Sequence, residues 1–209
     1  MKSYLIILML SLTFGCIGPD TDGREPVDYK ELKARPDLES ATLAGGCFWC
    51  IEAAFQEMPG VIEAVSGYTG GMSADPNYQA VSTGDTGHYE AVQVFYDPGK
   101  VSYEEILSEF WKNIDPTDES GQFADKGSQY KTAIFYHDEM QRLKAASSLK
   151  KMDESGKYDK PIKTKIIKLK RFYEAEDYHQ DYYLKDSIRY KAYKTGSGRE
   201  GYISKNWEE

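Results

Sequence analysis

The chain has 209 residues and a formal net charge of −8, from 26 basic and 34 acidic side chains. Acidic and basic residues are interspersed, and the sequence lacks the basic patch of a nucleic-acid-binding surface, so we expect no nucleic-acid partner. The length is sufficient for one domain with its own hydrophobic core. The 17 tyrosines supply apolar area with a polar end, which suits a core beside a wet pocket.

The N-terminal segment, residues 1–16, differs in composition from the rest of the chain. Lys2 is followed by an apolar run over residues 4–14, which is too short to cross a bilayer as a helix, and then by Gly15-Cys16. This pattern predicts a secretory signal peptide over residues 1–16, and its end is similar to a lipoprotein cleavage site with Cys16 as the lipidated residue. Thr13 and Phe14 stand where Leu and a small residue are usual, so an ordinary signal peptide and an uncleaved anchor are alternatives.

The N-terminal pattern also predicts where the protein is found. We expect an exported protein that a lipid on Cys16 holds at the cell membrane, on the cell surface or in the periplasm, without other membrane contact. If the segment is not a signal, the protein is cytoplasmic. Residues 17–40 are rich in Pro, Asp, Gly, Glu and Lys and predict a tether, and residues 41–209 predict one folded domain.

The folded domain opens with an apolar strand over residues 41–44, a turn at Gly45-Gly46 and a helix that ends near Met58. Later strands are predicted over residues 61–68, 90–96, 130–136 and 163–169. Helices are predicted over residues 103–114, 139–153 and 176–184, the first with a capping box from Ser102. Residues 72–88 and 118–128 predict loops, and 185–209 a tail that wraps the surface. This order predicts an α+β two-layer sandwich, a mixed sheet with helices on one face, of the ferredoxin-like or split βαβ type.

Two cysteines, Cys47 and Cys50, follow the first predicted turn. Cys47 is expected at a helix N-terminus, where free N–H groups and the helix dipole favour ionisation of a thiol. Cys50 is one helical turn further on, with Cα atoms about 5–6 Å apart, which is a distance that a disulfide spans. An ionisable thiol beside a partner thiol predicts thiol redox chemistry.

Other uses of this cysteine pair are less well supported. A structural zinc site needs four ligands, and the rest of the chain offers only Cys16 and three scattered histidines, so we expect no metal. Haem attachment needs CxxCH, but residue 51 is Ile. A structural disulfide would close a very short loop and add little stability. A thioredoxin-like dithiol–disulfide oxidoreductase stays an alternative, as does a surface-anchored module whose aromatic residues grip peptides.

Three further residues near the cysteines or on the predicted sheet have side chains suited to such a site. Phe48 and Trp49 form an aromatic wall that suits a methyl group or a thioether, although core packing is an equal alternative for Phe48. Glu90 lies at the start of a predicted strand. A partly buried carboxyl group there can stay protonated and act as an acid, the alternative being an exposed strand-end carboxylate.

A series of motifs runs in order through residues 41–207. They are Gly46-Cys47-Phe48-Trp49, Gly67-Tyr68-Thr69-Gly70-Gly71, Asp75-Pro76-Asn77-Tyr78, Thr86-Gly87-His88-Tyr89-Glu90, Asp115-Pro116-Thr117, Asp125-Lys126-Gly127-Ser128-Gln129-Tyr130 and the stretch 172–180. In this series the chain resembles the A-type peptide methionine sulfoxide reductases. The resemblance implies an enzyme of protein repair after oxidative stress, which reduces methionine S-sulfoxide, free or in oxidised proteins, to methionine.

The resemblance also implies roles for single residues. The Cys47 thiolate attacks the sulfoxide sulfur and is left as a sulfenic acid, while Glu90 protonates the departing oxygen. Hydrogen bonds from Tyr78 and Tyr130 hold that oxygen, and Asp125 supports this polar side. Phe48 and Trp49 hold the methyl group of the substrate. No cofactor is implied, and we expect a monomer.

The chain departs from the usual family pattern in three places. Cys50 stands where Gly usually follows GCFW, the tail 185–209 lacks the resolving cysteines of many members, and Lys131 replaces Arg. The first two departures compensate, because Cys50 is then the thiol that condenses with the sulfenic acid. We expect thioredoxin, or a thioredoxin-like extracytoplasmic dithiol, to reduce the resulting disulfide.

Overall fold

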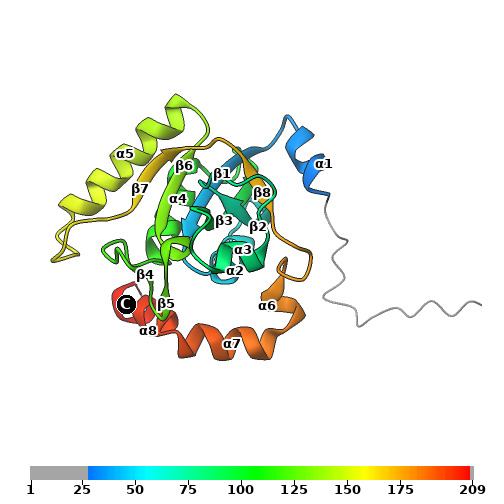
Figure 1. Ribbon diagram of the computed structural model, residues 1–209. Coiled ribbons are helices and arrows are strands. Elements are labelled where there is room, and N and C mark those ends of the chain that lie inside the picture. The colour runs from blue at the N-terminus through cyan, green and yellow to red at the C-terminus, as the bar shows by residue number, and fades with distance from the viewer. Residues whose placement is uncertain (1–27, 208–209) are drawn as a thin grey trace, which may run out of the picture.

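A mixed six-stranded sheet forms the centre of the protein (Figure 1). The computed structural model describes residues 28–207. The strand order is β7-β6-β1-β3-β2-β8; β6 and β7 pair in parallel, and the other neighbours are antiparallel. The strands are β1 (Glu39–Gly45), β2 (Val61–Thr69), β3 (Tyr89–Tyr96), β6 (Thr132–Tyr136), β7 (Lys165–Lys168) and β8 (Phe172–Glu174).

The four inner strands have the split βαβ topology. Along the chain, α2 (Phe48–Gln56) connects β1 to β2, and α4 (Tyr103–Lys112) connects β3 to β6. In the sheet, β3 lies between β1 and β2, while β1 lies between β3 and β6, so each β-α-β unit encloses a strand of the other. The predicted α+β class with a mixed sheet and a split βαβ arrangement is confirmed.

Most of the core lies between the sheet and the helices α2, α4 and α5 (Glu139–Glu154). Period-2 alternation sends Leu43 and Val92 to this face, and Ala44 and Phe95 to the other. The capping box of α4 is present, with Ser102 and Glu105 bonding to each other's backbone N–H. No helix within residues 28–207 is long and apolar enough to cross a membrane.

The prediction of a tether over residues 17–40 is wrong from residue 28 onward. Residues Tyr29–Ala34 form α1, capped by Asp28, and β1 begins at Glu39 rather than Ala41. Leu32 is 2% exposed and packs on the second face of the sheet, so α1 covers the face opposite α2 and α4. Burial of this face stabilises α1 although the polar composition of the segment is typical of a linker. The predicted signal segment, with Cys16, lies outside the described residues.

The C-terminal part also differs from the prediction. The predicted helix over residues 176–184 is present only at its end, where α6 (Tyr182–Lys185) follows a turn over residues 177–181. The expected surface tail contains α7 (Ser187–Gly196) and α8 (Arg199–Trp207). Figure 1 shows these helices on the side of the molecule where α2 and the small hairpin of β4 (Gly121–Gln122) and β5 (Asp125–Lys126) lie. Gly196 and Gly198 indicated a loop, but Gly198, at φ 88°, only separates two helices.

Candidate active site

A small cavity of about 70 Å³ opens at the N-terminus of α2. It is lined by Cys47, Phe48, Trp49, Tyr78, Glu90, Asp125, Tyr130 and Tyr193. The first seven are residues singled out by sequence, and they come from four separate motifs of the chain. Tyr193, from α7, was not predicted. The fold therefore brings the predicted residues together at one place.

The backbone turn before α2 places Cys47 in this cavity. Gly46 has φ 85°, a conformation that side chains disfavour, and a Cβ there would fall 2.6 Å from Cβ of Gln122. Cys47 then takes the N-cap position of α2, as expected, and is 6% exposed. Both cysteines of the described range have free thiols.

Glu90 lies beneath this turn. It is in β3, whose neighbours are β1 and β2, and it is 2% exposed. Its Oε2 accepts a hydrogen bond from the backbone N–H of Phe48 at 3.0 Å. Burial nevertheless raises the pKa of Glu90 to about 8, because water cannot solvate the carboxylate. The side chain is therefore mostly protonated at neutral pH, as an acid must be.

The electrostatics of the two thiols differ from the prediction. Burial, followed by the neighbouring Cys50 and Glu90, raises the pKa of Cys47 well above its ordinary value. The first N–H groups of α2 do little to stabilise a Cys47 thiolate, because Phe48 N–H bonds to Glu90 and Cys50 N–H bonds to the carbonyl of Cys47. The expectation that Cys47 ionises more easily than a free cysteine is wrong for the resting site.

Cys50 lies behind the cavity rather than in its wall. It is 2% exposed and packs with Ala53, Tyr183 and Tyr190. The hydrogen bond from the Cys47 thiol lowers the pKa of Cys50 to about 7, against the opposing effect of burial. Cys50, rather than Cys47, is therefore the thiol of the pair that ionises near neutral pH.

An aromatic wall forms the apolar side of the cavity, as expected. Phe48 is 1% exposed, and Trp49 stacks on Tyr182 with ring centroids 3.9 Å apart. The Trp49 indole N–H donates to Nδ1 of His179 at 3.1 Å. The His179 ring in turn lies 4.4 Å from that of Tyr78. The hydrogen bond from Trp49 to His179 fixes the plane of the indole ring, which can then pack against an apolar group of a substrate.

His179 and Tyr182 were not predicted as site residues, although His179 lies in the motif over residues 172–180. Burial lowers the pKa of His179, so the ring is neutral, and its Nδ1 accepts, which places the proton on Nε2. That Nε2 is buried without a hydrogen-bond partner in the described structure. The turn between His179 and Tyr182 is held by Glu52, whose carboxyl group accepts from Asp181 N–H at 2.6 Å.

Tyr193 closes the polar side. Its hydroxyl donates to Asp125 Oδ2 and also hydrogen-bonds to Cys47. The sequence signal for this residue was weak: Tyr190 and Tyr193 are three residues apart, which places them on one helical face only if the tail is helical. Because the tail was predicted as irregular, this spacing was not recognised.

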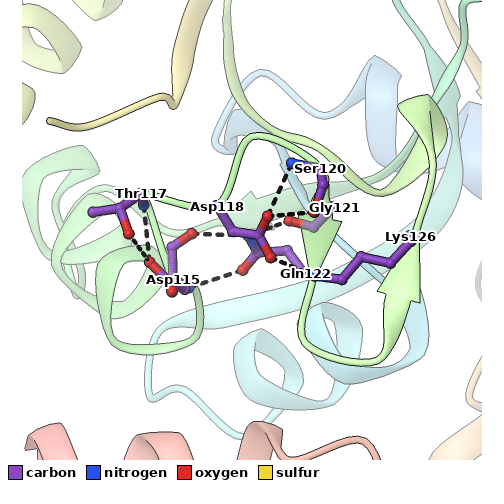
Figure 2. Close-up of polar contacts among 7 residues, drawn as sticks. All are labelled: Asp115, Thr117, Asp118, Ser120, Gly121, Gln122 and Lys126. Atoms are coloured by element: carbon purple, nitrogen blue, oxygen red, sulfur yellow. Dashed lines mark hydrogen bonds and ion pairs between the residues drawn. The ribbon is translucent and has the colours of Figure 1, made fainter. Parts of the chain in front are cut away.

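A polar network keeps the loop that carries Asp125 in place, as Figure 2 shows. The Gln122 side chain accepts from the N–H of Asp115 and donates to its carbonyl, each at 2.8 Å. Asp118 accepts from both Ser120 and Lys126. These bonds leave little freedom to β4 and β5, so Asp125 has a defined position at the cavity.

Comparison with known proteins identifies the family. Residues 39–209 match the family model described as peptide methionine sulfoxide reductase. The chain belongs to the peptide methionine sulfoxide reductase family. It is 51% identical over 169 residues to peptide methionine sulfoxide reductase MsrA of Bacillus licheniformis, covering 81% of this chain and 93% of that protein. For MsrA of Bacillus subtilis the values are 52%, 81% and 96% over 169 residues.

Solved structures of this reductase family have the same fold. Methionine sulfoxide reductase A of Corynebacterium diphtheriae is similar with a TM-score of 0.71 and 31% identity, over 75% of this chain and 78% of that one. Mxr1 of Saccharomyces cerevisiae in reduced form has a TM-score of 0.70 and 31% identity, over 74% and 89%. The resemblance drawn from the motif series is thus confirmed, and the thioredoxin-like alternative is set aside.

Two remaining expectations concern metal ions and Lys131. Within residues 28–207, no group of three or more His, Cys, Asp or Glu side chains is placed to hold a metal ion. None of the ion pairs recorded in that range includes Lys131, which stands where this reductase family usually has Arg.

Proposed function

We propose that this protein reduces methionine S-sulfoxide, free and in oxidised proteins, with Cys47 as the attacking thiol. Membership of the reductase family supports the reaction. The single observation that supports the residue assignment is the cavity, in which one thiol lies between a buried protonated carboxyl group and an aromatic wall. A sulfoxide needs these three features: a nucleophile for sulfur, an acid for oxygen and an apolar surface for the methyl group.

In the first step, the Cys47 sulfur attacks the sulfoxide sulfur while Glu90 donates its proton to the sulfoxide oxygen. The hydroxyls of Tyr78 and Tyr130 line the same cavity and hydrogen-bond that oxygen, and Asp125, held by Tyr193, supports this polar side. The oxygen then passes to the Cys47 sulfur and methionine leaves as a thioether. Glu90 recovers the proton that the Cys47 thiol loses, so the step leaves a sulfenic acid on Cys47.

In the second step, Cys50 attacks the sulfenic sulfur of Cys47. A sulfur–sulfur bond forms, the sulfur–oxygen bond breaks, and the oxygen leaves as water. Each thiol affects the pKa of the other in the resting site, and this proximity supports the step. The tail has no cysteine to compete with Cys50.

A dithiol from outside the protein then reduces the Cys47–Cys50 disulfide and restores both thiols. The solved complex of the yeast Mxr1 with Trx2 supports a thioredoxin as this reductant. The N-terminal pattern supports export and a lipid on Cys16, and an exported monomer needs a thioredoxin-like reductant outside the cytoplasm. Oxidised surface proteins are then its substrates.

A turnover assay tests the proposal. The domain beginning at Pro26 is mixed with dithiothreitol and either methionine S-sulfoxide or the R epimer, and methionine is measured. We expect turnover of the S epimer alone, and none from Cys47→Ser, which loses the nucleophile. Cys50→Ser is the matched control for thiol loss, since it keeps Cys47 and still releases methionine. Absence of turnover with both epimers contradicts the proposed activity, and turnover by Cys47→Ser contradicts the residue assignment.

A further inference from the structure

Arg199, the first residue of α8, is a buried cation. It is 1% exposed and ranks among the largest fully buried side chains. Its guanidinium donates to two main-chain carbonyls, those of Gly45 at 2.9 Å and of Asn113. None of the ion pairs recorded within residues 28–207 includes it. A buried charge with only neutral partners is costly, and so it calls for an anion nearby.

The Arg199 guanidinium contacts the Gly45-Gly46 turn, which leads directly into the segment with the two thiols. Nη2 bonds to Gly45, and a Cβ built on Gly46 would fall 2.8 Å from the same nitrogen. The ring of Phe123 covers the guanidinium from another side, with its centroid 4.7 Å away. Because solvent is excluded on these sides, the positive charge acts on the thiols with little screening.

Few other charges act on Cys50. Its titratable or charged neighbours are Cys47 at the N-cap of α2, Glu90 on β3, Asp125 on β5, Tyr183 on α6, Tyr190 and Lys194 on α7, and Arg199 on α8. Glu90 is protonated at neutral pH and Tyr190 stays neutral, because burial raises both pKa values. Asp125 disfavours a negative charge on Cys50, and Lys194 is only half-buried, so solvent screens its charge. Arg199 is thus the buried cation of this set.

We propose that Arg199 is a positioning residue that keeps one negative charge on the dithiol pair, centred on the Cys50 sulfur. Given the proposed reductase function, Cys50 is then already a thiolate when Cys47 becomes a sulfenic acid. The thiolate attacks the Cys47 sulfur, the sulfur–oxygen bond breaks, and the leaving hydroxide takes the Glu90 proton and departs as water. Glu90 then regains a proton from solvent. The thiolate enters this step without first losing a proton, so it proceeds at neutral pH.

The C-terminal tail, which has no cysteine, contributes side chains to the site. Helices α7 and α8 both contact the site: Tyr193 hydrogen-bonds to Cys47, and Arg199 donates to the carbonyl of Gly45 in the turn before Cys47. Here the tail supplies a hydroxyl and a cation to a thiol pair that lies wholly on α2 and its N-cap.

The test is a pH titration of thiolate ultraviolet absorbance in the reduced protein, without substrate. Wild type should show one thiol that ionises near neutral pH, and Cys50→Ser should remove it. Arg199→Gln and Arg199→Met should raise that pKa by about one unit, as loss of a neighbouring opposite charge does. Arg199→Lys should restore most of the shift. Lys205→Gln, on the exposed side of the same helix, is the matched control and should leave the pKa unchanged.

A kinetic readout separates this role from a structural one. After one turnover at neutral pH, disulfide formation relative to methionine release should fall about tenfold in Arg199→Gln and recover at alkaline pH, where Cys50 ionises unaided. If Arg199→Gln and Arg199→Met fold and keep the thiol pKa of the wild type, the proposal is overturned. If those variants do not fold, the wild-type titration decides, because a near-neutral thiol that survives Cys50→Ser also overturns it. A shifted pKa in a protein without reductase turnover would instead contradict the proposed function alone.

Discussion

The backbone N–H of Phe48 donates to Oε2 of Glu90 at 3.0 Å, which ties the start of α2 to the second residue of β3. These residues are 42 positions apart in the chain. The bond holds a buried carboxyl group immediately beside the residue that follows Cys47. A single contact thereby sets the relative position of the proposed nucleophile and the proposed acid.

Glu90→Gln should lower the rate of methionine release by about a hundredfold, because the amide keeps the shape but cannot donate a carboxyl proton. The pKa of Glu90 is raised to about 8, so wild-type activity should fall as pH rises through about 8, when the acid loses its proton. The variant should lack this fall. Single-turnover rates between pH 6 and pH 10 measure both effects, with Glu57→Gln on the exposed end of α2 as control. Near-normal turnover by Glu90→Gln would reassign the acid, with Tyr130 as the next candidate.

Cys50→Ser should release one methionine per enzyme and then stop when thioredoxin is the reductant. Cys47 and Glu90 remain, so the first step proceeds, but nothing condenses with the sulfenic acid. Mass spectrometry should find a Cys47–Cys50 disulfide in wild type and a dimedone adduct on Cys47 in the variant. A small thiol that enters the cavity should sustain part of the turnover. Full thioredoxin-driven turnover by Cys50→Ser would show that this enzyme needs no resolving cysteine.

Tyr193→Phe should lower the rate of methionine release by about tenfold, which corresponds to the loss of one hydrogen bond of about 1.4 kcal/mol. The substitution removes the hydrogen bonds to Asp125 and Cys47 but keeps the ring that packs beside Trp49. Single-turnover kinetics measure the rate, and circular dichroism checks that the fold is kept. Tyr136→Phe, at the end of β6 and outside the cavity, is the matched control. Equal rates in the two variants would limit Tyr193 to packing.

Cys16→Ala should leave the protein exported but soluble, or unprocessed at the membrane, because the proposed lipid attachment site is lost. Cell fractionation and mass spectrometry of the mature N-terminus measure the outcome. Wild type should carry a lipid on Cys16 and sediment with membranes. Mature, unlipidated wild-type protein in the cytoplasm would contradict export.

Several features could be predicted because local chemistry decides them. The Gly45-Gly46 turn and the apolar period after it predicted α2 with Cys47 at its N-terminus, and the Ser102–Glu105 pair predicted the start of α4. Alternation and turn residues predicted the four inner strands, β1, β2, β3 and β6, to within a few residues. The order of these elements then predicted the split βαβ topology, since few arrangements of such a series are possible.

What only the tertiary structure decided depends on long-range packing. Helix α1 forms where Leu32 is buried on the second face of the sheet, although its sequence is as polar as a linker. In the tail, Tyr193 and Arg199 gain their positions only because α7 and α8 dock against α2, β5 and the turn at Gly45. The spacing of Tyr190 and Tyr193 is a weak signal, and no spacing within the tail indicates Arg199.

The sequence by itself determined which residues could do the chemistry, because the motifs that carry Cys47, Glu90 and Phe48 are local and specific. The tertiary structure decided their protonation states. Local sequence predicted an easily ionised Cys47 from the helix N-terminus, but burial raises its pKa, and the hydrogen bond between the thiols lowers that of Cys50 to about 7. Desolvation depends on everything that packs around a group, whereas a helix terminus depends on a few neighbouring residues, and here the larger effect comes from the packing.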